Sequence, residues 1–410
     1  MVKFDLIVIG GGAAGFFGAI QAASMTPGLR VMILEKSSKL LSKVRVSGGG
    51  RCNVTHHCFN ASKLAQHYPR GEKPLKSLFK SFDAEAIVEW FRSKGVILKT
   101  ENDGRMFPTT DRSETIIECF LGEADRLKIV VKMNSAVTSI ASQDNMLTVV
   151  TSGGEQYMSA KVLVAIGGHA NPNAYQWLIS NGHSLRKPIP SLFTFNDSKK
   201  VFTDLMGISV PDATVRIAGT KFSEKGPVLL THWGLSGPAV IKLSAWAAEY
   251  LHDANYVFTV LVNWTGSIQE ETLRAQLTAF KAQRGKLKIV TNSMFNLPNR
   301  LWQRLCALSE INDVKIWGEL SMRSMNKLIE HLIRCQFEIK GKTTFKEEFV
   351  TCGGIDLRDV DLTTMESKIV RNVYFAGEVL DIDGETGGFN FQSAWTTAYV
   401  AASSMARKQR

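Results

Sequence analysis

A glycine-rich turn near the start of the chain has the residue types and the spacing that bind a nucleotide pyrophosphate. The apolar run 4–9 leads into Gly10-Gly11-Gly12-Ala13-Ala14-Gly15, and Glu35 follows 20 residues after Gly15. In this order of strand, turn, helix and strand, Gly10 permits the tight turn, Gly12 admits a phosphate, and Gly15 allows close packing. The helix N-terminus would donate N–H groups to the pyrophosphate, and Glu35 would accept hydrogen bonds from a ribose diol. An ordinary buried βαβ unit is the weaker alternative, because order, spacing and acid all agree with the dinucleotide fingerprint.

A second glycine cluster, Ser47-Gly48-Gly49-Gly50-Arg51-Cys52-Asn53, follows the Glu35 strand. Consecutive glycines expose backbone N–H groups and admit a ligand closely. Arg51 could neutralise a phosphate or hold an anionic substrate, and Asn53 offers both a donor and an acceptor. A flexible surface turn is the alternative, but the position near the expected cofactor favours a binding loop.

A third cluster occupies residues 377–392, where a strand delivers Gly377-Glu378 and a helix is expected to begin near Gly388. If the ligand is a flavin, N–H groups at this helix start would stabilise the negative charge that develops on reduction. Asn390 and Gln392 could hydrogen-bond the ring or the substrate. The acidic residues of the cluster could equally serve only to solvate a loop, but the glycines among them favour a functional role.

An α/β fold must position these segments. Strands are predicted at 30–34, 129–133, 136–140, 147–151, 161–166 and 372–376, and helices at 84–94, 113–126 and 388–406. Between them lie predicted short strands at 192–195, 214–217, 228–230 and 257–262 and predicted helices at 236–251, 267–283, 299–308 and 321–335. The dinucleotide fold is therefore expected to be discontinuous, with its last strand joining the sheet that starts the chain.

The chain is basic, with 49 Lys and Arg against 38 Asp and Glu and a formal charge of +11. Part of the excess lies at Lys281, Arg284, Lys286 and Lys288. Such a balance favours polyanionic partners, nucleic acid above all, although a generally basic surface that aids solubility fits equally well. No recognisable RNA- or DNA-binding module is present.

The cysteines and the apolar runs argue against a disulfide-bonded, metal-binding or membrane-spanning protein. The chain has six cysteines, none of which are arranged as a Cys-x-x-Cys motif, and their spacings suggest no disulfide framework. Cys52 and Cys58 bracket His56-His57, but standard zinc spacings are absent, so no metal site is expected. No apolar run reaches the ~18 residues of a spanning helix, and no signal peptide precedes the first strand. We therefore expect a cytoplasmic protein with no membrane partner, while the oligomeric state is unreadable.

The three clusters, together with two further motifs, resemble the YhiN/BaiN-like flavoproteins over essentially the whole chain. The further motifs are Thr231-His232-x-Gly234-Leu235-Ser236-Gly237-Pro238 and Thr364-Met365-Glu366-Ser367-Lys368. The resemblance implies a discontinuous Rossmann-like FAD-binding domain at 1–190 and 345–410. It also implies an inserted β-rich domain at 191–266 and 320–344 that carries a small helical domain at 267–319. The chain departs from the family pattern after Gly168, where relatives carry a longer Gly/Ser-rich segment.

The resemblance also implies a set of FAD contacts. The pyrophosphate would lie against the first glycine turn, the adenosine end against Glu35, Lys36 and Val137, and the flavin against the second and third clusters. The implied FAD contacts are Gly10, Gly12, Ala13, Ala14, Gly15, Glu35, Lys36, Lys43, Ser47, Gly48, Arg51, Cys52, Asn53, Val137, Ala165, Gly167, Gly377, Glu378, Asp383, Gly388, Phe389 and Asn390.

His232 and Arg105 are the candidate reaction residues. His232 precedes a Gly-Leu-Ser-Gly-Pro turn where a side chain can face a cleft, and Arg105 lies in Gly104-Arg105-Met106-Phe107-Pro108. Each could equally be structural, the histidine bonding to the backbone and the arginine pairing with a carboxylate.

The expected function is an FAD-dependent reductase that passes hydride from NAD(P)H through the flavin to a C=C bond conjugated to a carbonyl. The resemblance implies two substrates, a uridine of ribosomal RNA and a small unsaturated ketone such as a steroid. The basic charge favours RNA, whose target base would have to be unstacked. The alternatives are a small-molecule enone reductase and a non-catalytic FAD-containing factor that binds RNA.

Overall fold

The computed structural model describes residues 2–343 and 350–406, and the chain divides into two compact units. The first unit comprises residues 1–191 and 346–410, and the second comprises residues 192–345. This division falls close to the predicted boundaries of the FAD-binding domain. The further division of the insertion into a β-rich and a helical domain stays a prediction.

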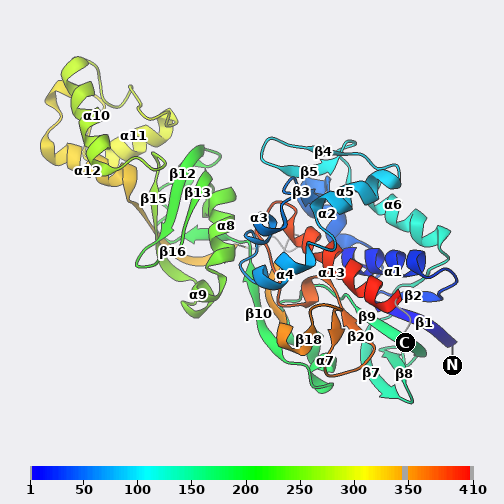
Figure 1. Ribbon diagram of the computed structural model, residues 1–410. Coiled ribbons are helices and arrows are strands. Elements are labelled where there is room, and N and C mark those ends of the chain that lie inside the picture. The colour runs from blue at the N-terminus through cyan, green and yellow to red at the C-terminus, as the bar shows by residue number, and fades with distance from the viewer. Residues whose placement is uncertain (1, 344–349, 407–410) are drawn as a thin grey trace. The chain divides into compact units, whose positions relative to one another are not determined.

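A nine-stranded sheet forms the centre of the first unit (Figure 1). Its strands run in the order β18-β19-β20-β9-β1-β2-β6, with β8 added to β9 and β7 added to β8. Strands β20, β9, β1, β2 and β6 are parallel to one another, which is the arrangement that βαβ crossovers produce. The bounds are β1 Val2–Ile9, β2 Val31–Leu34, β6 Val130–Lys132, β7 Val137–Gln143, β8 Met146–Thr151, β9 Gln156–Val164, β18 Val360–Asp361, β19 Glu366–Ser367 and β20 Val373–Phe375.

The two ends of the chain therefore share one sheet, because β20 and β1 both pair with β9. Register joins Val8 to Leu163 and Leu163 to Tyr374. All three side chains are buried, as expected for a sheet covered on both faces. The α/β class and the discontinuous Rossmann-type unit are confirmed.

Helices cover this sheet and extend the same hydrophobic core. Helix α1 (Ala13–Met25) lies beside α13 (Phe389–Ala406), and a Cβ added at Gly18 of α1 would meet both Leu163 of β9 and Ala398 of α13 (Figure 1). The other helices of this unit are α2 Ser42–Gly50, α3 Ala61–Ala65, α4 Glu72–Leu78, α5 Ala84–Ser93, α6 Ser113–Arg126 and α7 Gln176–Ser180, with 3-10 turns η1 Pro172–Tyr175, η4 Leu357–Asp359 and η5 Gly377–Val379.

Two small antiparallel sheets complete the first unit. One contains β3 (Thr55–His56), β5 (Arg105–Pro108) and β4 (Leu98–Thr100), and the other pairs β10 (Leu185–Ser191) with β17 (Val350–Ile355). The first of these sheets carries Arg105 on β5, directly opposite His56 on β3.

A closed barrel forms the sheet of the second unit. Its order is β11-β14-β13-β12-β15-β16, and closure comes from pairing of β16 with β11. The strand bounds are β11 Thr194–Asp197, β12 Ser209–Ile217, β13 Ser223–Leu230, β14 Gly234–Ser236, β15 Val257–Asn263 and β16 Cys335–Thr343. Closure satisfies the edge groups that an open sheet would leave unpaired.

The helices predicted at 267–283 and 321–335 are observed in shorter form, at Glu270–Gln283 and Met322–Ile333, and the prediction fails at one place. The single helix predicted at 236–251 is wrong: Ser236 ends β14, Gly237 turns with φ 98°, and two helices follow with a break at Ala247. These are α8 Pro238–Trp246 and α9 Ala248–Asp253, and the remaining helices are α10 Glu270–Gln283, α11 Asn299–Leu308 and α12 Met322–Ile333, with turns η2 Thr203–Leu205 and η3 Trp317–Glu319. Side chains of the barrel and of α10–α12 belong to one hydrophobic cluster.

Among the described residues, no helix has both the length and the apolar character needed to cross a membrane.

Candidate cofactor and substrate site

The first glycine turn has the backbone that a pyrophosphate requires. Gly10 adopts φ 112°, and a Cβ at this position would lie 2.3 Å from the carbonyl oxygen of Ala165. A Cβ at Gly15 would lie 1.9 Å from the carbonyl oxygen of Gly10. Any side chain at these two positions would therefore force the turn, α1 and β9 apart, which explains the glycine spacing.

The start of α1 is open to a ligand. Gly12 is the N-cap, no side chain caps the helix, and its first turn has no acidic residue. A Cβ added at Gly12 would meet nothing within 4 Å, so the space outside this turn is free. The helix start, including Ala13 and Ala14, thus combines exposed donor groups with the positive end of the helix dipole. These residues fit the pyrophosphate of a dinucleotide.

Glu35 follows β2 and is bonded back to the turn. Its Oε2 accepts a hydrogen bond from the Gly11 N–H at 2.8 Å, and its Oε1 accepts from the Ser37 N–H and the Ser37 hydroxyl, each at 2.8 Å. Each carboxylate oxygen has more than one lone-pair site, so acceptor capacity for a ribose hydroxyl remains.

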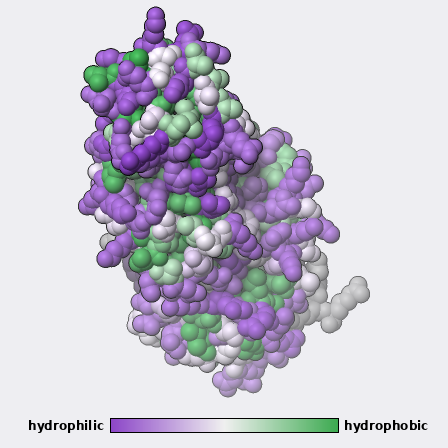
Figure 2. Space-filling model, turned by 90° about the vertical axis from the view of Figure 1, so that its left-hand side faces the viewer, coloured by the Kyte–Doolittle hydropathy of each residue, from purple (hydrophilic) through white to green (hydrophobic). Residues whose placement is uncertain are grey.

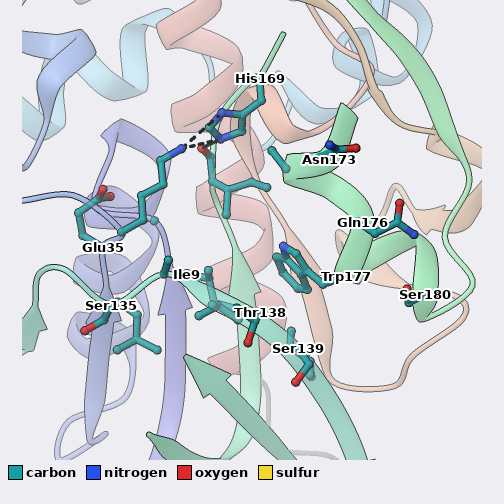
Figure 3. A pocket seen from close by; sticks show the side chains of 18 of the residues that line it. Ile9, Glu35, Ser135, Thr138, Ser139, His169, Asn173, Gln176, Trp177 and Ser180 are labelled. Atoms are coloured by element: carbon teal, nitrogen blue, oxygen red, sulfur yellow. Dashed lines mark hydrogen bonds between the residues drawn. The ribbon is translucent and has the colours of Figure 1, made fainter. Parts of the chain in front are cut away.

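A cavity of about 640 Å³ opens beside Glu35 (Figure 3). It brings together Gly10, Glu35, Lys36 and Val137, four of the predicted cofactor contacts, at the ends of β1, β2 and β7. Its other wall contains residues that were not predicted to bind a ligand, among them His169, Asn173, Gln176 and Trp177. His169 and Asn173 belong to the segment 168–174, where a departure from the family pattern was expected, and Gln176 and Trp177 lie on α7. This cavity has the position that the adenosine end of a dinucleotide takes in such folds.

The side chains of Lys36 and His169, which both line this cavity, contact each other (Figure 3). The Lys36 Nζ atom lies 3.4 Å from both ring nitrogens of His169. Burial lowers the pKa of His169 below its ordinary value, and the charges of Lys36 and Lys43 lower it further. The imidazole is therefore neutral at pH 7 and can accept or donate a hydrogen bond.

Contacts between the two ends of the chain bring the three glycine clusters together in the first unit. A Cβ at Gly377 would lie 2.8 Å from the Cβ of Ala14. The Asn53 amide lies between the Thr55 carbonyl and the Gly388 N–H, and the amide orientation that satisfies both donates to Thr55 at 3.0 Å and accepts from Gly388 at 2.9 Å. The first, second and third clusters thus lie next to one another, as a single ligand that contacts all three would require.

The second cluster is a loop in its backbone angles. It forms the end of α2, but Ser47 has ψ 147° and Gly48 and Gly49 have positive φ. The Ser47 hydroxyl donates to the Val44 carbonyl, and Cys52 is buried with a pKa that burial raises to about 12. The Cys52 thiol is therefore protonated and unsuited to nucleophilic chemistry.

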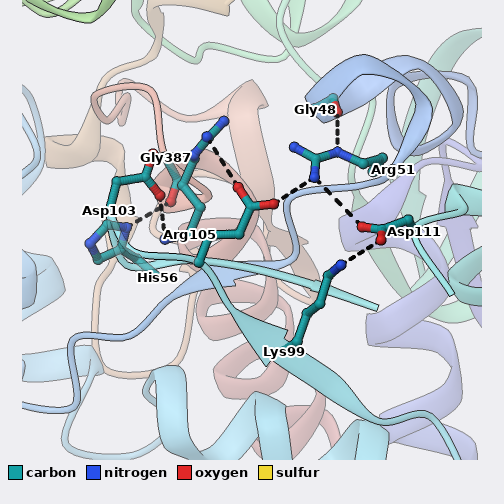
Figure 4. A network of polar contacts seen from close by, with 9 residues as sticks. Gly48, Arg51, His56, Lys99, Asp103, Arg105, Asp111 and Gly387 are labelled. Atoms are coloured by element: carbon teal, nitrogen blue, oxygen red, sulfur yellow. Dashed lines mark hydrogen bonds and ion pairs between the residues drawn. The ribbon is translucent and has the colours of Figure 1, made fainter. Parts of the chain in front are cut away.

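Arg51 and Arg105 form a charge network around Glu101 (Figure 4). Arg51 Nη1 lies 2.6 Å from Glu101 Oε1, and Arg105 Nη2 lies 3.2 Å from Glu101 Oε2. Arg51 also donates to the Gly48 carbonyl, and its guanidinium lies 4.0 Å from the centre of the Phe107 ring. Asp103 adds a second carboxylate at 2.7 Å from Arg105 Nε. Arg51, the candidate anion-binding residue, and Arg105, the candidate reaction residue, are thus both paired with carboxylates in this structure.

The third cluster contains one partly exposed ion pair and one buried ion pair. Glu378 bonds to Lys43 at 2.5 Å and to the Thr351 N–H at 2.9 Å. Asp383 is fully buried and pairs with Arg70, whose Nε lies 2.6 Å from Asp383 Oδ1. Burial raises the pKa of Asp383, and Arg70 opposes this shift.

The remaining predicted contacts lie around the same loops. Asn390 is bonded to both the N–H and the carbonyl of Gly384, so its side chain closes the third cluster on itself. Gly167 has φ 75° and open space around it. Whether Asp383 and Asn390 contact a cofactor stays a prediction, because their side chains already hold the loop.

Two histidines that sequence analysis did not assign to this site lie against Phe389. The His56 ring is stacked 4.7 Å from the Phe389 ring and its Nδ1 lies 3.1 Å from the Gly387 carbonyl oxygen. The His67 ring is stacked 4.2 Å from Phe389, and its Nδ1 lies 3.0 Å from Glu385 Oε2. Only the closeness of His56 to Asn53 in sequence could have indicated the first of them.

His232 belongs to the second unit. Its side chain is exposed and lies 4.3 Å from the Trp233 ring, and the preceding Thr231 bonds to Gly234 across the turn. The reaction roles of His232 and Arg105 stay predictions. In residues 2–343 and 350–406, no group of three or more His, Cys, Asp or Glu side chains could hold a metal ion.

Comparison with known proteins identifies relatives over nearly the full length. A family model described as the HI0933-like protein Rossmann domain matches residues 4–404. The chain is 30% identical over 412 residues to a ribosomal RNA dihydrouridine synthase of Escherichia coli K12, and 27% identical over 414 residues to a 3-dehydro-bile acid delta(4,6)-reductase of Clostridium scindens. Each comparison covers 98% of both chains.

A solved structure supports the fold. The 3-ketosteroid-delta4-(5alpha)-dehydrogenase of Rhodococcus jostii RHA1 superposes with a TM-score of 0.54 at 13% identity, covering 99% of this chain and 97% of that one. The identity is too low to carry more than the fold. The match to the family model covers all three glycine clusters. The chain therefore belongs to the HI0933-like Rossmann family, in agreement with the YhiN/BaiN-like resemblance of its motifs.

Proposed function

We propose that this chain is an FAD-dependent reductase that uses NAD(P)H to saturate a carbonyl-conjugated C=C bond in a uridine of ribosomal RNA. The broader statement, that the chain is an FAD-dependent oxidoreductase, follows from its family together with the dinucleotide cradle. The hydride donor and the substrate are our proposal.

One observation carries the cofactor assignment: Ala14, Gly377 and the Asn53–Gly388 contact bring both ends of the chain to one place. Bound FAD would supply the hydride chemistry. The start of α1 would hold the pyrophosphate, Glu35 a ribose, and the cavity lined by Lys36 and Val137 the adenine. Residues 47–53 and 377–390 would hold and enclose the flavin end.

In the net reaction the substrate gains a hydride from NAD(P)H on one carbon and a proton on its neighbour, and NAD(P)⁺ is released. A guanidinium such as that of Arg105 can polarise the carbonyl oxygen, and an imidazole such as that of His232 can deliver a proton. We propose these two roles for the two candidate reaction residues.

Two observations favour RNA over a small enone. The relative at 30% identity is named for a ribosomal RNA activity. The formal charge of +11 would attract a polyanion much more strongly than a small enone that carries at most one or two negative charges. A small unsaturated ketone remains the second candidate substrate, which the bile-acid reductase relative supports.

The test is a reductase assay with the purified FAD-loaded protein. NADH or NADPH oxidation is followed with ribosomal RNA from a strain that lacks the gene, with a 3-oxo-Δ4 steroid, and with neither. We expect oxidation that depends on RNA, and RNA uridines that gain two hydrogens by mass spectrometry. Steroid-dependent oxidation alone would select the enone reductase, and RNA binding without oxidation of either nicotinamide would select the non-catalytic factor.

A further inference from the structure

A turn in the second unit carries a concentration of positive charge. No Asp or Glu occurs between Glu271 and Glu310, whereas this stretch contains seven basic residues: Arg274, Lys281, Arg284, Lys286, Lys288, Arg300 and Arg304. Three of them, Arg284, Lys286 and Lys288, fall in the turn 284–288 that follows α10, which we call the basic turn.

The other four basic residues of the stretch are bonded within the protein. Arg274 pairs with Glu270 at 3.0 Å, and Arg304 with Asp204 at 2.6 Å. Lys281 donates to the Leu320 carbonyl, and Arg300 donates to the Asp204 carbonyl. These side chains serve the fold of the second unit.

The three cations of the basic turn are different. All three side chains are exposed, and none forms an ion pair or a side-chain hydrogen bond with any residue in 2–343 or 350–406. The face of the molecule in Figure 2 is mainly hydrophilic, with apolar side chains gathered in separate patches. The charges are therefore available to a partner from solution.

The backbone beneath these side chains is fixed. Lys288 and Ile316 form an antiparallel bridge, and the Trp317 N–H donates to the Leu287 carbonyl at 2.9 Å. The buried Trp302 indole donates to the Ile289 carbonyl at 2.8 Å. The backbone of the turn is thus held by hydrogen bonds to residues 316–317 and to the Trp302 indole, so binding does not have to order this part of the chain.

We propose that the basic turn is a docking surface for the phosphate backbone of the RNA substrate, an inference that rests on the proposed function. Three unpaired cations within five residues match the closely spaced phosphates of a polynucleotide. A lipid surface fits less well, because Leu287, 38% exposed, is the one large apolar side chain that the turn exposes. Contacts to phosphate position an RNA without reading its sequence, so the surface would serve affinity and orientation.

The test compares two triple variants of the full-length FAD-loaded protein that lose equal charge. The first is Arg284→Gln, Lys286→Gln and Lys288→Gln. The control is Lys199→Gln, Lys225→Gln and Lys327→Gln, whose cations pair with Glu338, Asp212 and Glu310 of the same unit. Affinity for labelled, protein-free ribosomal RNA is measured at several salt concentrations, and FAD content and thermal unfolding check the fold of each variant.

We expect the basic-turn variant to bind RNA at least about tenfold more weakly at low salt, and its log–log salt slope to fall by about 2 to 3. The control should stay within about twofold of the wild type. The reductase activity of the basic-turn variant on uridine should fall at low RNA concentration and recover as the RNA concentration approaches saturation.

Equal losses of RNA affinity in the two triple variants would contradict the proposed docking surface, because the total charge of the protein would then explain the binding. The surface would also fail if the basic-turn variant bound RNA normally but lost binding to phosphatidylglycerol vesicles. If the wild type binds and reduces RNA and the basic-turn variant does so equally well, the proposed docking surface is wrong and the proposed function still holds. A wild type that neither binds nor reduces RNA overturns both.

Discussion

The carboxylate of Glu35 accepts a hydrogen bond from the Gly11 N–H at 2.8 Å, which ties the end of β2 to the glycine turn after β1. The second carboxylate oxygen accepts from Ser37. One acidic side chain thus fixes two loops that flank the cavity proposed for adenosine.

Replacing this acid should weaken cofactor binding. In Glu35→Gln one acceptor oxygen becomes an NH₂ group that faces a backbone donor, so we expect a loss of about 1–3 kcal/mol in FAD binding. The measurement is a titration of apoprotein with FAD, followed by flavin fluorescence. Glu89→Gln, an exposed residue of α5 paired with Arg92, is the control. Equal FAD affinity of Glu35→Gln and wild type would remove Glu35 from the site.

Trp177 should contribute to the binding of FAD but not of FMN, since it lines the cavity proposed for the adenosine end. We expect Trp177→Leu to weaken FAD binding by about 0.5–1.5 kcal/mol through loss of aromatic contact. FMN lacks adenosine and serves as the matched ligand in the same fluorescence titration. Equal losses with both ligands would show that Trp177 acts on the fold and not on adenosine.

How much of this site was predictable depends on the range of each contact. The Gly10–Gly15 turn and Glu35 could be predicted because their fingerprint is local in sequence. The wall formed by His169 and Trp177 could not, because the segment after Gly168 has no recognisable motif and its role follows only from folding against β7.

Contacts between residues far apart in the sequence could not be predicted either. Arg70 and Asp383 are 313 positions apart, and no periodicity links them. His56 lies opposite Arg105 only because β3 and β5 pair in that register. In the second unit strands overlapping β11, β12, β13 and β15 were predicted, but β14 and β16 were not. Barrel closure depends on the pairing of β11 with β16, which strand patterns do not specify.

His169 should make stability depend on pH. The pKa of His169 in the folded state lies below the ordinary 6.5. As the pH decreases through 6.5, the unfolded chain therefore binds more protons than the folded protein, and the free energy of unfolding decreases. His169→Gln removes this contribution. We expect the wild-type advantage in unfolding free energy over His169→Gln to shrink between about pH 7.5 and about pH 5.5.

Urea unfolding of the two apoproteins at several pH values measures this difference. His183, whose pKa is also lowered by burial, is present in both proteins and cancels. A wild-type advantage that is constant or grows toward acidic pH would contradict the assignment.

The buried pair of Arg70 and Asp383 should be costly to break. Asp383→Asn leaves the Arg70 guanidinium, 13% exposed, without its counter-charge, so we expect a loss of about 3–5 kcal/mol in unfolding free energy. Urea unfolding measures the loss, and a double-mutant cycle with Arg70→Met separates the pair from its surroundings. A loss below about 1 kcal/mol would show that the pair is not important for stability.

Reduction of a ribosomal RNA uridine is tested by mapping dihydrouridine in ribosomal RNA from three strains: one with the gene, one lacking it, and one in which the deletion is complemented by Glu35→Gln. We expect at least one dihydrouridine that is present with the wild-type gene, absent from the deletion strain and less abundant with Glu35→Gln. A ribosomal RNA dihydrouridine pattern that is identical in all three strains would show that the protein does not reduce ribosomal RNA.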